Sequence, residues 1–161
     1  MDNKNNDYSI VFSQVQKAYG KNIVINNLNL EIEKGERLIL LGPSGCGKTT
    51  TLRMIAGFEE ITKGDLFMGG ARVNDVAPGE RNIAMVFQSY ALFPHLSVWE
   101  HITFGLQLQK LPQAEIEKRT RQALELLHLE GYENKKTHEL SGGQKQRVAL
   151  CRALVKQSPY F

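Results

Sequence analysis

Cysteine and long apolar runs are scarce in this chain of 161 residues. The two cysteines, Cys46 and Cys151, lie far apart without paired spacing, which favours a reducing compartment over a disulfide framework. No apolar run approaches the ~18 residues that a membrane-spanning helix needs. Residues 1–7 are polar and lack the apolar core of a secretion signal. The sequence therefore predicts a protein that is neither secreted nor integral to a membrane.

A large excess of charge of either sign is also missing. The chain has 20 basic and 17 acidic residues, a formal net charge of +3, and the basic residues form no long stripe. This balance is typical of a solvated surface, so we expect no nucleic-acid partner. Hydrophobic residues make up 42% of the chain, which at this length can form a core without disulfide or metal staples.

Strand signals dominate the first half of the chain. β-Branched or alternating apolar residues predict strands at 10–12, 23–25, 28–32 and 64–67, with a turn at Tyr19-Gly20. Residues 38–41 are apolar without alternation, which is typical of a strand covered on both faces in a parallel α/β sheet. Residues 83–87 predict a further buried strand that runs into Gln88.

Helix signals follow these strands. Apolar residues at 52, 55 and 56 have helical spacing, and Gly57 offers a C-terminal cap. Ser97 and Glu100 have the spacing of a capping box, and Pro112 marks the start of another helix. Ser141 opens the last helix. We therefore expect a mixed β and α/β core with a helical insertion over about 89–140.

A glycine-rich segment after residues 38–41 has a phosphate-binding pattern. It matches G-x-x-x-x-G-K-[ST] with Gly42, Pro43, Ser44, Gly45, Cys46, Gly47, Lys48 and Thr49. The glycines let successive amides point at one phosphate, and the following helix adds its positive N-terminal end. Lys48 would reach the β- and γ-phosphates, and the Thr49 hydroxyl would ligate Mg²⁺.

A second pattern is Leu140-Ser141-Gly142-Gly143-Gln144. Ser141 and Gln144 alone have capping-box spacing, and the two glycines could simply give the chain room to turn. A cap does not need two glycines, however, and exposed amides at a helix start form a second anion site. Because one phosphate does not need two such sites, the pair suggests that each contributes half of a pocket between two subunits.

These residues resemble a known family. The segment 42–49, Gln88 after a strand, and the run from Leu140 to Arg147, in that order, resemble the nucleotide-binding subunit of ATP-binding cassette (ABC) transporters. The resemblance covers about residues 10–161. It implies an α/β fold: a P-loop NTPase core with an antiparallel β subdomain and a helical insertion, incomplete at the C-terminus.

The resemblance also implies the ligands and their residues. ATP would be bound by Tyr19, which would stack on adenine, and by residues of the glycine-rich segment and the next helix: Gly42, Pro43, Ser44, Gly45, Cys46, Gly47, Lys48, Thr49 and Thr50. Mg²⁺ would be held by Thr49 and Gln88. Lys48 and Gln88 would serve catalysis, and Ser141, Gly142, Gly143 and Gln144 would act in trans on the nucleotide of a second subunit.

The same resemblance divides the chain into functional parts. Residues 8–161 would form a partial nucleotide-binding domain, with the β subdomain and P-loop core at 8–88, the helical subdomain at 89–140, and the signature helix with the start of the next strand at 141–161. Family members continue past Ser158-Pro159 into an apolar strand that ends in Asp-Glu, and no such ending occurs here. We therefore expect the first part of a longer ATPase that is inactive alone.

A finer resemblance, carried by residues 86–98 and 104–106, is to the ATPases of bacterial importers for sugars, polyamines or ferric ions. It implies a subunit that couples ATP binding and hydrolysis to solute import. Its partners would be a second subunit in a head-to-tail dimer, transmembrane permease subunits and, indirectly, a solute-binding protein. Its place would be cytoplasmic, peripheral on the inner face of the plasma membrane.

Other interpretations stay open from the residues. The chain could be a nucleotide-binding module without turnover, or a P-loop kinase, although a kinase leaves Leu140 to Gln144 unused. DNA-repair relatives share both motifs but insert long coiled coils between them, whereas here short capped helices separate Gln88 from Leu140.

Overall fold

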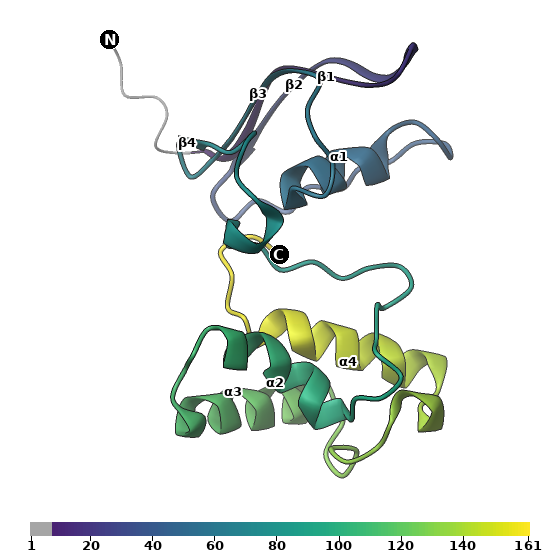
Figure 1. Cartoon of the computed structure of the whole chain (residues 1–161), viewed down its shortest axis with the longest axis vertical. Coiled ribbons are helices and arrows are strands. Elements are labelled where there is room, and N and C mark those ends of the chain that lie inside the picture. The colour runs from purple at the N-terminus through teal and green to yellow at the C-terminus, as the bar shows by residue number, and fades with distance from the viewer. Residues whose placement is uncertain (1–7) are drawn as a thin grey trace. The chain divides into compact units, whose positions relative to one another are not determined.

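The computed structural model describes residues 8–161 and divides them into two compact units, with the break between Arg81 and Asn82 (Figure 1). The predicted division into functional parts, with breaks after 88 and 140, stays a prediction. No helix among the described residues is long and apolar enough to cross a membrane.

A four-stranded antiparallel sheet forms the first unit's framework. Its strands are β1 (Tyr8–Tyr19), β2 (Asn22–Glu33), β3 (Lys63–Met68) and β4 (Ala71–Arg72), in the spatial order β2-β1-β3-β4. The strands predicted in this region are confirmed, and those expected at 23–25 and 28–32 are one continuous strand. Gly20, with φ of 59°, makes the turn between β1 and β2, a conformation that costs glycine little.

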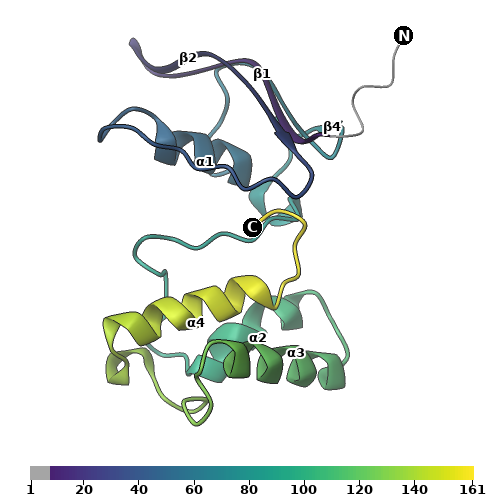
Figure 2. The ribbon, with the colours of Figure 1, turned by 180° about the vertical axis from the view of Figure 1, so that it is seen from behind.

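Helix α1 (Lys48–Ala56) lies along one face of this sheet (Figures 1 and 2). It ends at Gly57, whose φ of 80° makes the predicted C-terminal cap. Met54 and Ala56 are fully buried with the sheet residues Phe12 and Leu66. Leu52 has helical spacing with Ile55 and Ala56, but it is 47% exposed, because the buried face of α1 is centred on Met54.

Arg81 binds the end of α1 to the chain that follows β4. Its guanidinium, only 6% exposed, donates to the carbonyls of Met54, Ile55, Val73 and Val76 at 2.6–3.0 Å. Two of these carbonyls belong to the last turn of α1, where the helix dipole favours a cation. The short 3₁₀-helix η2 (Pro78–Glu80) leads directly into Arg81.

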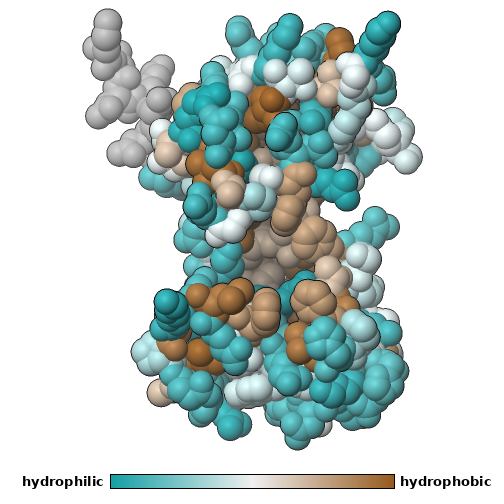
Figure 3. All heavy atoms as spheres, in the orientation of Figure 1, coloured by the Kyte–Doolittle hydropathy of each residue, from teal (hydrophilic) through white to brown (hydrophobic). Residues whose placement is uncertain are grey.

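The strand predicted at 38–41 is not formed in the structure. No strand among residues 8–161 pairs with this segment, and Ile39 and Leu41 are 76% and 86% exposed. In the view of Figure 3, hydrophilic side chains predominate over the surface of the first unit. An apolar run favours burial, but a strand also requires a neighbouring backbone to accept and donate its hydrogen bonds, so the prediction was wrong here.

Three helices form the second unit: α2 (Val98–Leu108), α3 (Gln113–Leu126) and α4 (Gly142–Leu154). They pack together around the buried side chains of Ile102, Leu106, Leu124, Val148 and Cys151 (Figure 2). The helix starts predicted at Ser97, Pro112 and Ser141 are confirmed as the residues before α2, α3 and α4.

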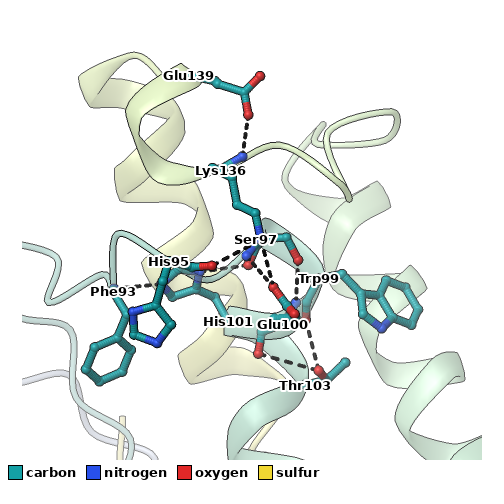
Figure 4. Close-up of polar contacts among 9 residues, drawn as sticks. All are labelled: Phe93, His95, Ser97, Trp99, Glu100, His101, Thr103, Lys136 and Glu139. Atoms are coloured by element: carbon teal, nitrogen blue, oxygen red, sulfur yellow. Dashed lines mark hydrogen bonds and ion pairs between the residues drawn. The ribbon is translucent and has the colours of Figure 1, made fainter.

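A capping box fixes the start of α2, as its sequence spacing predicts. The Glu100 carboxylate accepts the Ser97 amide at 2.6 Å, and the Ser97 hydroxyl accepts the Glu100 amide at 3.2 Å (Figure 4). These bonds, together with the Lys136 ammonium at 3.4 Å, lower the pKa of Glu100 from 4.5 to about 2. Lys136 precedes the 3₁₀-helix η3 (Thr137–Glu139).

The second strand that the structure does not form is the one expected at 83–87. Only Ile83 makes a bridge, in parallel with Tyr160, and the Ala84 amide donates to the Tyr160 carbonyl at 2.9 Å. Residues 84–87 continue as irregular chain toward Gln88. Residues 83–87 are partly buried, unlike 38–41, but as at 38–41 a continuous hydrogen-bonded neighbour is missing from the described part of the chain.

Candidate functional site

The glycine-rich segment forms a tight loop at the start of α1. Gly45 and Gly47 have φ of 82° and 94°, values that side chains disfavour. A Cβ added to Gly47 would lie 2.9 Å from the Ile25 side chain on β2, closer than such atoms approach. Glycine is therefore required at 47 both for the backbone angle and for the close approach of the loop to the sheet.

Lys48 places its ammonium within this loop. Nζ donates to the carbonyls of Gly42 and Pro43 at 2.6 and 2.7 Å and lies 3.4 Å from the Cys46 sulfur. No side chain caps the first amides of α1, whose N-cap is Gly47. The loop thus combines a positive side chain with the N–H groups of a helix start, the combination that binds phosphate.

The other predicted residues of the loop lie at its surface. Pro43, Ser44, Cys46 and Thr49 are exposed, and Thr50 is half-buried. The exposed Thr49 hydroxyl is an oxygen donor of the type that Mg²⁺ prefers. Among residues 8–161 no cluster of three or more histidine, cysteine or acidic side chains could hold a metal ion.

Tyr19 lies at the end of β1, and an ionic cluster holds its ring. The Lys17 ammonium is 4.7 Å from the ring centroid, 2.8 Å from the Glu59 carboxylate and 2.8 Å from the Glu60 carbonyl. Hydrogen bonds from Lys17 and Tyr19 lower the pKa of Glu59. The Tyr19 side chain is 46% exposed, so part of the ring can still contact a ligand.

This cluster is close to the glycine-rich loop. Lys17 is the cross-strand partner of Ile25, and Ile25 is the residue against which Gly47 packs. The hairpin of β1 and β2 therefore brings Tyr19 and the loop to the same region of the first unit, although Tyr19 and Gly42 are 23 positions apart in the sequence.

Gln88 lies in the second unit at the corner of a turn. The Tyr90 amide donates to the Phe87 carbonyl at 2.9 Å and closes the turn, and the Gln88 side chain is exposed. Two residues that follow, Tyr90 and Ala91, have φ of 63° and 48°. Non-glycine residues with such angles are uncommon, and they persist where the surrounding structure holds them.

The Leu140–Gln144 pattern forms the start of α4. The Gln144 side chain accepts the Ser141 amide at 2.8 Å, and the Ser141 hydroxyl accepts the Gln144 amide at 3.3 Å, so the capping box is present. A Cβ added to Gly142 or Gly143 would meet nothing within 4 Å. The fold of the second unit therefore gives no steric reason for glycine at either position.

The structure thus groups the predicted residues by unit. Tyr19 and the segment 42–50 lie in the first unit, and Gln88 and residues 141–144 lie in the second. Sequence reasoning missed Lys17, which supports Tyr19, and Arg152, whose guanidinium binds the carbonyls of Tyr90 and Ala91. Neither residue belongs to a motif with a recognisable spacing, because both act through contacts that only the fold creates.

Comparison with known proteins gives sequence relatives. The chain is 55% identical over 141 residues to the oligosaccharides import ATP-binding protein MsmX of Bacillus subtilis, covering 88% of this chain and 39% of that protein. It is 53% identical over 150 residues to the Fe(3+) ions import ATP-binding protein FbpC of Photobacterium profundum, covering 93% and 43%. The chain therefore spans about two fifths of the length of these relatives.

A solved structure with the same fold is the dimeric bacterial ABC transporter cassette MJ0796. It matches with a TM-score of 0.82 and 33% identity over 92% of this chain and 70% of that one. The likeness confirms the predicted α/β fold of a cassette with an antiparallel sheet and a helical part. A family model described as ABC transporter matches residues 25–161. The chain therefore belongs to the ABC transporter family.

Proposed function

We propose that this chain is the ATP-binding part of an ABC import system that couples ATP binding and hydrolysis to solute transport. The observation that carries the proposal is the loop before α1, where Gly47 packs on Ile25 and the Lys48 ammonium lies among the loop carbonyls. This arrangement requires glycine at 47 and lysine at 48, and it places positive charge where a triphosphate would bind.

In this proposal Lys48 leaves the carbonyls of Gly42 and Pro43 to bind the β- and γ-phosphates. Charge-assisted bonds to phosphate are stronger than bonds to neutral carbonyls, so the exchange is favourable. The amides of residues 44–50 would bind the remaining phosphate oxygens, and Tyr19 would stack on adenine. Thr49 and Gln88 have the oxygen atoms that suit Mg²⁺, which would neutralise phosphate charge during hydrolysis.

The start of α4 would act on the nucleotide of a second subunit. Gly142 and Gly143 have open space around them, so glycine there suits the close approach of a ligand from outside the chain. The capping box of α4 uses the neutral Gln144, whereas that of α2 uses Glu100. A neutral side chain completes the cap without repelling a phosphate. The solved cassette MJ0796 is dimeric, which supports the proposal of a second subunit.

The remaining parts of the proposal concern the membrane and the solute. Permease subunits would hold the chain at the inner face of the plasma membrane, and a solute-binding protein would deliver the solute to them. The relatives are named for oligosaccharides and for Fe(3+) ions at similar identity, so the residues of this chain do not select between solutes. We therefore propose the class of importer and leave sugar, polyamine and iron as alternatives for experiment.

Uptake by whole cells tests this function. Cells that carry the wild-type gene or Lys48→Ala would be given labelled maltose, spermidine or ferric iron, with Lys34→Ala as a control at an exposed lysine of the same unit. We expect Lys48→Ala to abolish the uptake of one solute and Lys34→Ala to retain it. Unchanged uptake of all three solutes in the Lys48→Ala cells would contradict the proposal.

A further inference from the structure

The turn that carries Gln88 is bound to helix α4 by a single arginine. Arg152 Nη1 donates to the Ala91 carbonyl at 2.7 Å, and Nη2 donates to the Tyr90 carbonyl at 2.9 Å. The planar guanidinium presents its donors as a fixed fork, which suits two consecutive carbonyls better than the single ammonium of lysine does. Tyr90 and Ala91 both have a backbone with positive φ, which is uncommon for residues other than glycine.

The other end of the same segment is bound by a second cation. Lys156 Nζ donates to the Ile83 carbonyl at 2.6 Å, and the bridge from Tyr160 to Ile83 lies beside it. Arg152 and Lys156 are four residues apart, the spacing that places side chains on the same side of a helical turn. Residues 83–91, with Gln88 near the middle, are therefore attached at both ends to the segment 152–156.

Helix α4 connects this attachment, at its C-terminal end, with residues 141–144 at its N-terminal end. It runs from Gly142 to Leu154, 13 residues, so its length is ~20 Å at 1.5 Å per residue. Ser141 caps its first turn, and Arg152 lies in its last turn. Val148 and Cys151 between them are fully buried in the core of the second unit, which holds the helix in place.

We propose that Arg152, assisted by Lys156, is a positioning residue that joins the Gln88 loop to α4, so that Gln88 and the residues 141–144 move as one piece. The inference rests on the proposed function, in which Gln88 contacts Mg²⁺ and the attacking water. When the Arg152 guanidinium is lost, the carbonyls of Tyr90 and Ala91 lose their donors. The left-handed backbone of these two residues is then no longer held in place. Gln88 then samples several positions, and hydrolysis slows because the water is no longer oriented.

A simple packing role for Arg152 predicts a different outcome. If the side chain only filled space, methionine would replace its stem and hydrolysis would not depend on the donors. If it only stabilised the fold, its loss would add to the loss of Gln88 independently. A positioning role predicts that removing Gln88 first makes the loss of Arg152 irrelevant, which is the non-additivity that a double-mutant cycle detects.

The experiment measures ATP hydrolysis by the complete subunit assembled with its membrane partners. The variants are Arg152→Met, Arg152→Lys, Gln88→Ala and the double variant of Arg152→Met with Gln88→Ala. We expect Arg152→Met to lower kcat about tenfold or more with an unchanged KM for ATP, because the loop around Lys48 is untouched. Arg152→Lys should give an intermediate kcat, and the double variant should equal Gln88→Ala alone.

Arg121→Met is the matched control. Arg121 lies in the same unit with its guanidinium 5.8 Å from the centroid of the Trp99 ring, and its removal should leave kcat unchanged. If Arg152→Met does not fold, as a thermal melt would show, Lys156→Met takes its place with the same expected pattern.

Three results would overturn the inference: an unchanged kcat in the Arg152→Met enzyme, a rise in KM without a fall in kcat, or a further multiplicative loss in the double variant. A wild-type assembly without ATP hydrolysis would refute the proposed function and this inference together. An active wild type with unaffected variants would refute the role of Arg152 alone.

Discussion

Arg81 is a single side chain that binds the end of α1 and the segment 73–76 through four backbone carbonyls. Burial lowers its pKa, yet arginine keeps its charge, so the carbonyls satisfy a buried cation. We expect Arg81→Met to lower the free energy of unfolding by about 1–3 kcal/mol, because the buried carbonyls lose their donor. Urea unfolding followed by far-ultraviolet circular dichroism measures this change.

Arg72 provides the control for Arg81. It forms ion pairs with Asp65 and Asp75 in the same unit, but its side chain is 47% exposed. Exposed ion pairs contribute little, so Arg72→Met should change the free energy of unfolding much less than Arg81→Met does. Equal effects of the two substitutions would show that the buried carbonyls do not depend on Arg81.

The capping boxes of α2 and α4 have the same geometry but differ in charge. At α2 the pKa of Glu100 is lowered to about 2 by the hydrogen bonds from Ser97 and by Lys136 (Figure 4). A carboxylate with a lowered pKa stabilises the folded state above its unfolded pKa, and this contribution is lost as the pH falls from about 4.5 to 2. The second unit should therefore become less stable over that range.

Glu100→Gln tests this pH dependence. The amide can still accept a hydrogen bond, but it cannot titrate, so the variant should be less stable than wild type at pH 7 and the two stabilities should converge near pH 2. Unfolding in urea can be followed by the fluorescence of Trp99, the one tryptophan of the chain, which lies in α2. The control Glu125→Gln, at an exposed position of α3, should keep the wild-type dependence.

The capping box of α4 permits the opposite substitution, in which glutamate replaces glutamine. Gln144→Glu should preserve the fold, because a carboxylate accepts the Ser141 amide as Glu100 accepts that of Ser97. In the assembled enzyme it should leave ATP binding by each chain intact and lower hydrolysis at least about tenfold, since in the proposed dimer the new charge would face the phosphate of the second subunit's nucleotide. Hydrolysis at the wild-type rate would argue against any contact of Gln144 with nucleotide.

Local signals predicted helices and turns better than sheet pairing. The boxes at Ser97 and Ser141 and the cap at Gly57 involve residues close in sequence, so their spacing specifies the structure. The apolar runs at 38–41 and 83–87 favour burial in a strand but do not specify a pairing neighbour; within residues 8–161 neither has a full one, and Ile39 and Leu41 stay exposed. Leu52 shows the same limit, since helical spacing alone did not fix which face of α1 packs on the sheet.

Across the two units, the sequence predicted the site residues through motifs and not through contacts. The sequence singled out the segment 42–49 and the pattern 140–144 as candidates because their spacing of glycines and polar residues is typical of phosphate binding. Lys17 and Arg152 were not found, because their partners are a ring and carbonyls placed by distant parts of the chain. Supporting residues of this kind follow from the fold, even where the motif they support is evident.

Nucleotide binding underlies every functional step that we propose for the chain. Its direct measurement is the titration of the 161-residue chain with a fluorescent ATP analogue and Mg²⁺, followed by displacement with ATP, for wild type, Lys48→Ala and the control Lys34→Ala. We predict saturable, displaceable binding by wild type and by Lys34→Ala, and an affinity at least about tenfold lower for Lys48→Ala, which loses its charge-assisted bonds to phosphate. Identical binding curves for Lys48→Ala and wild type would contradict the account.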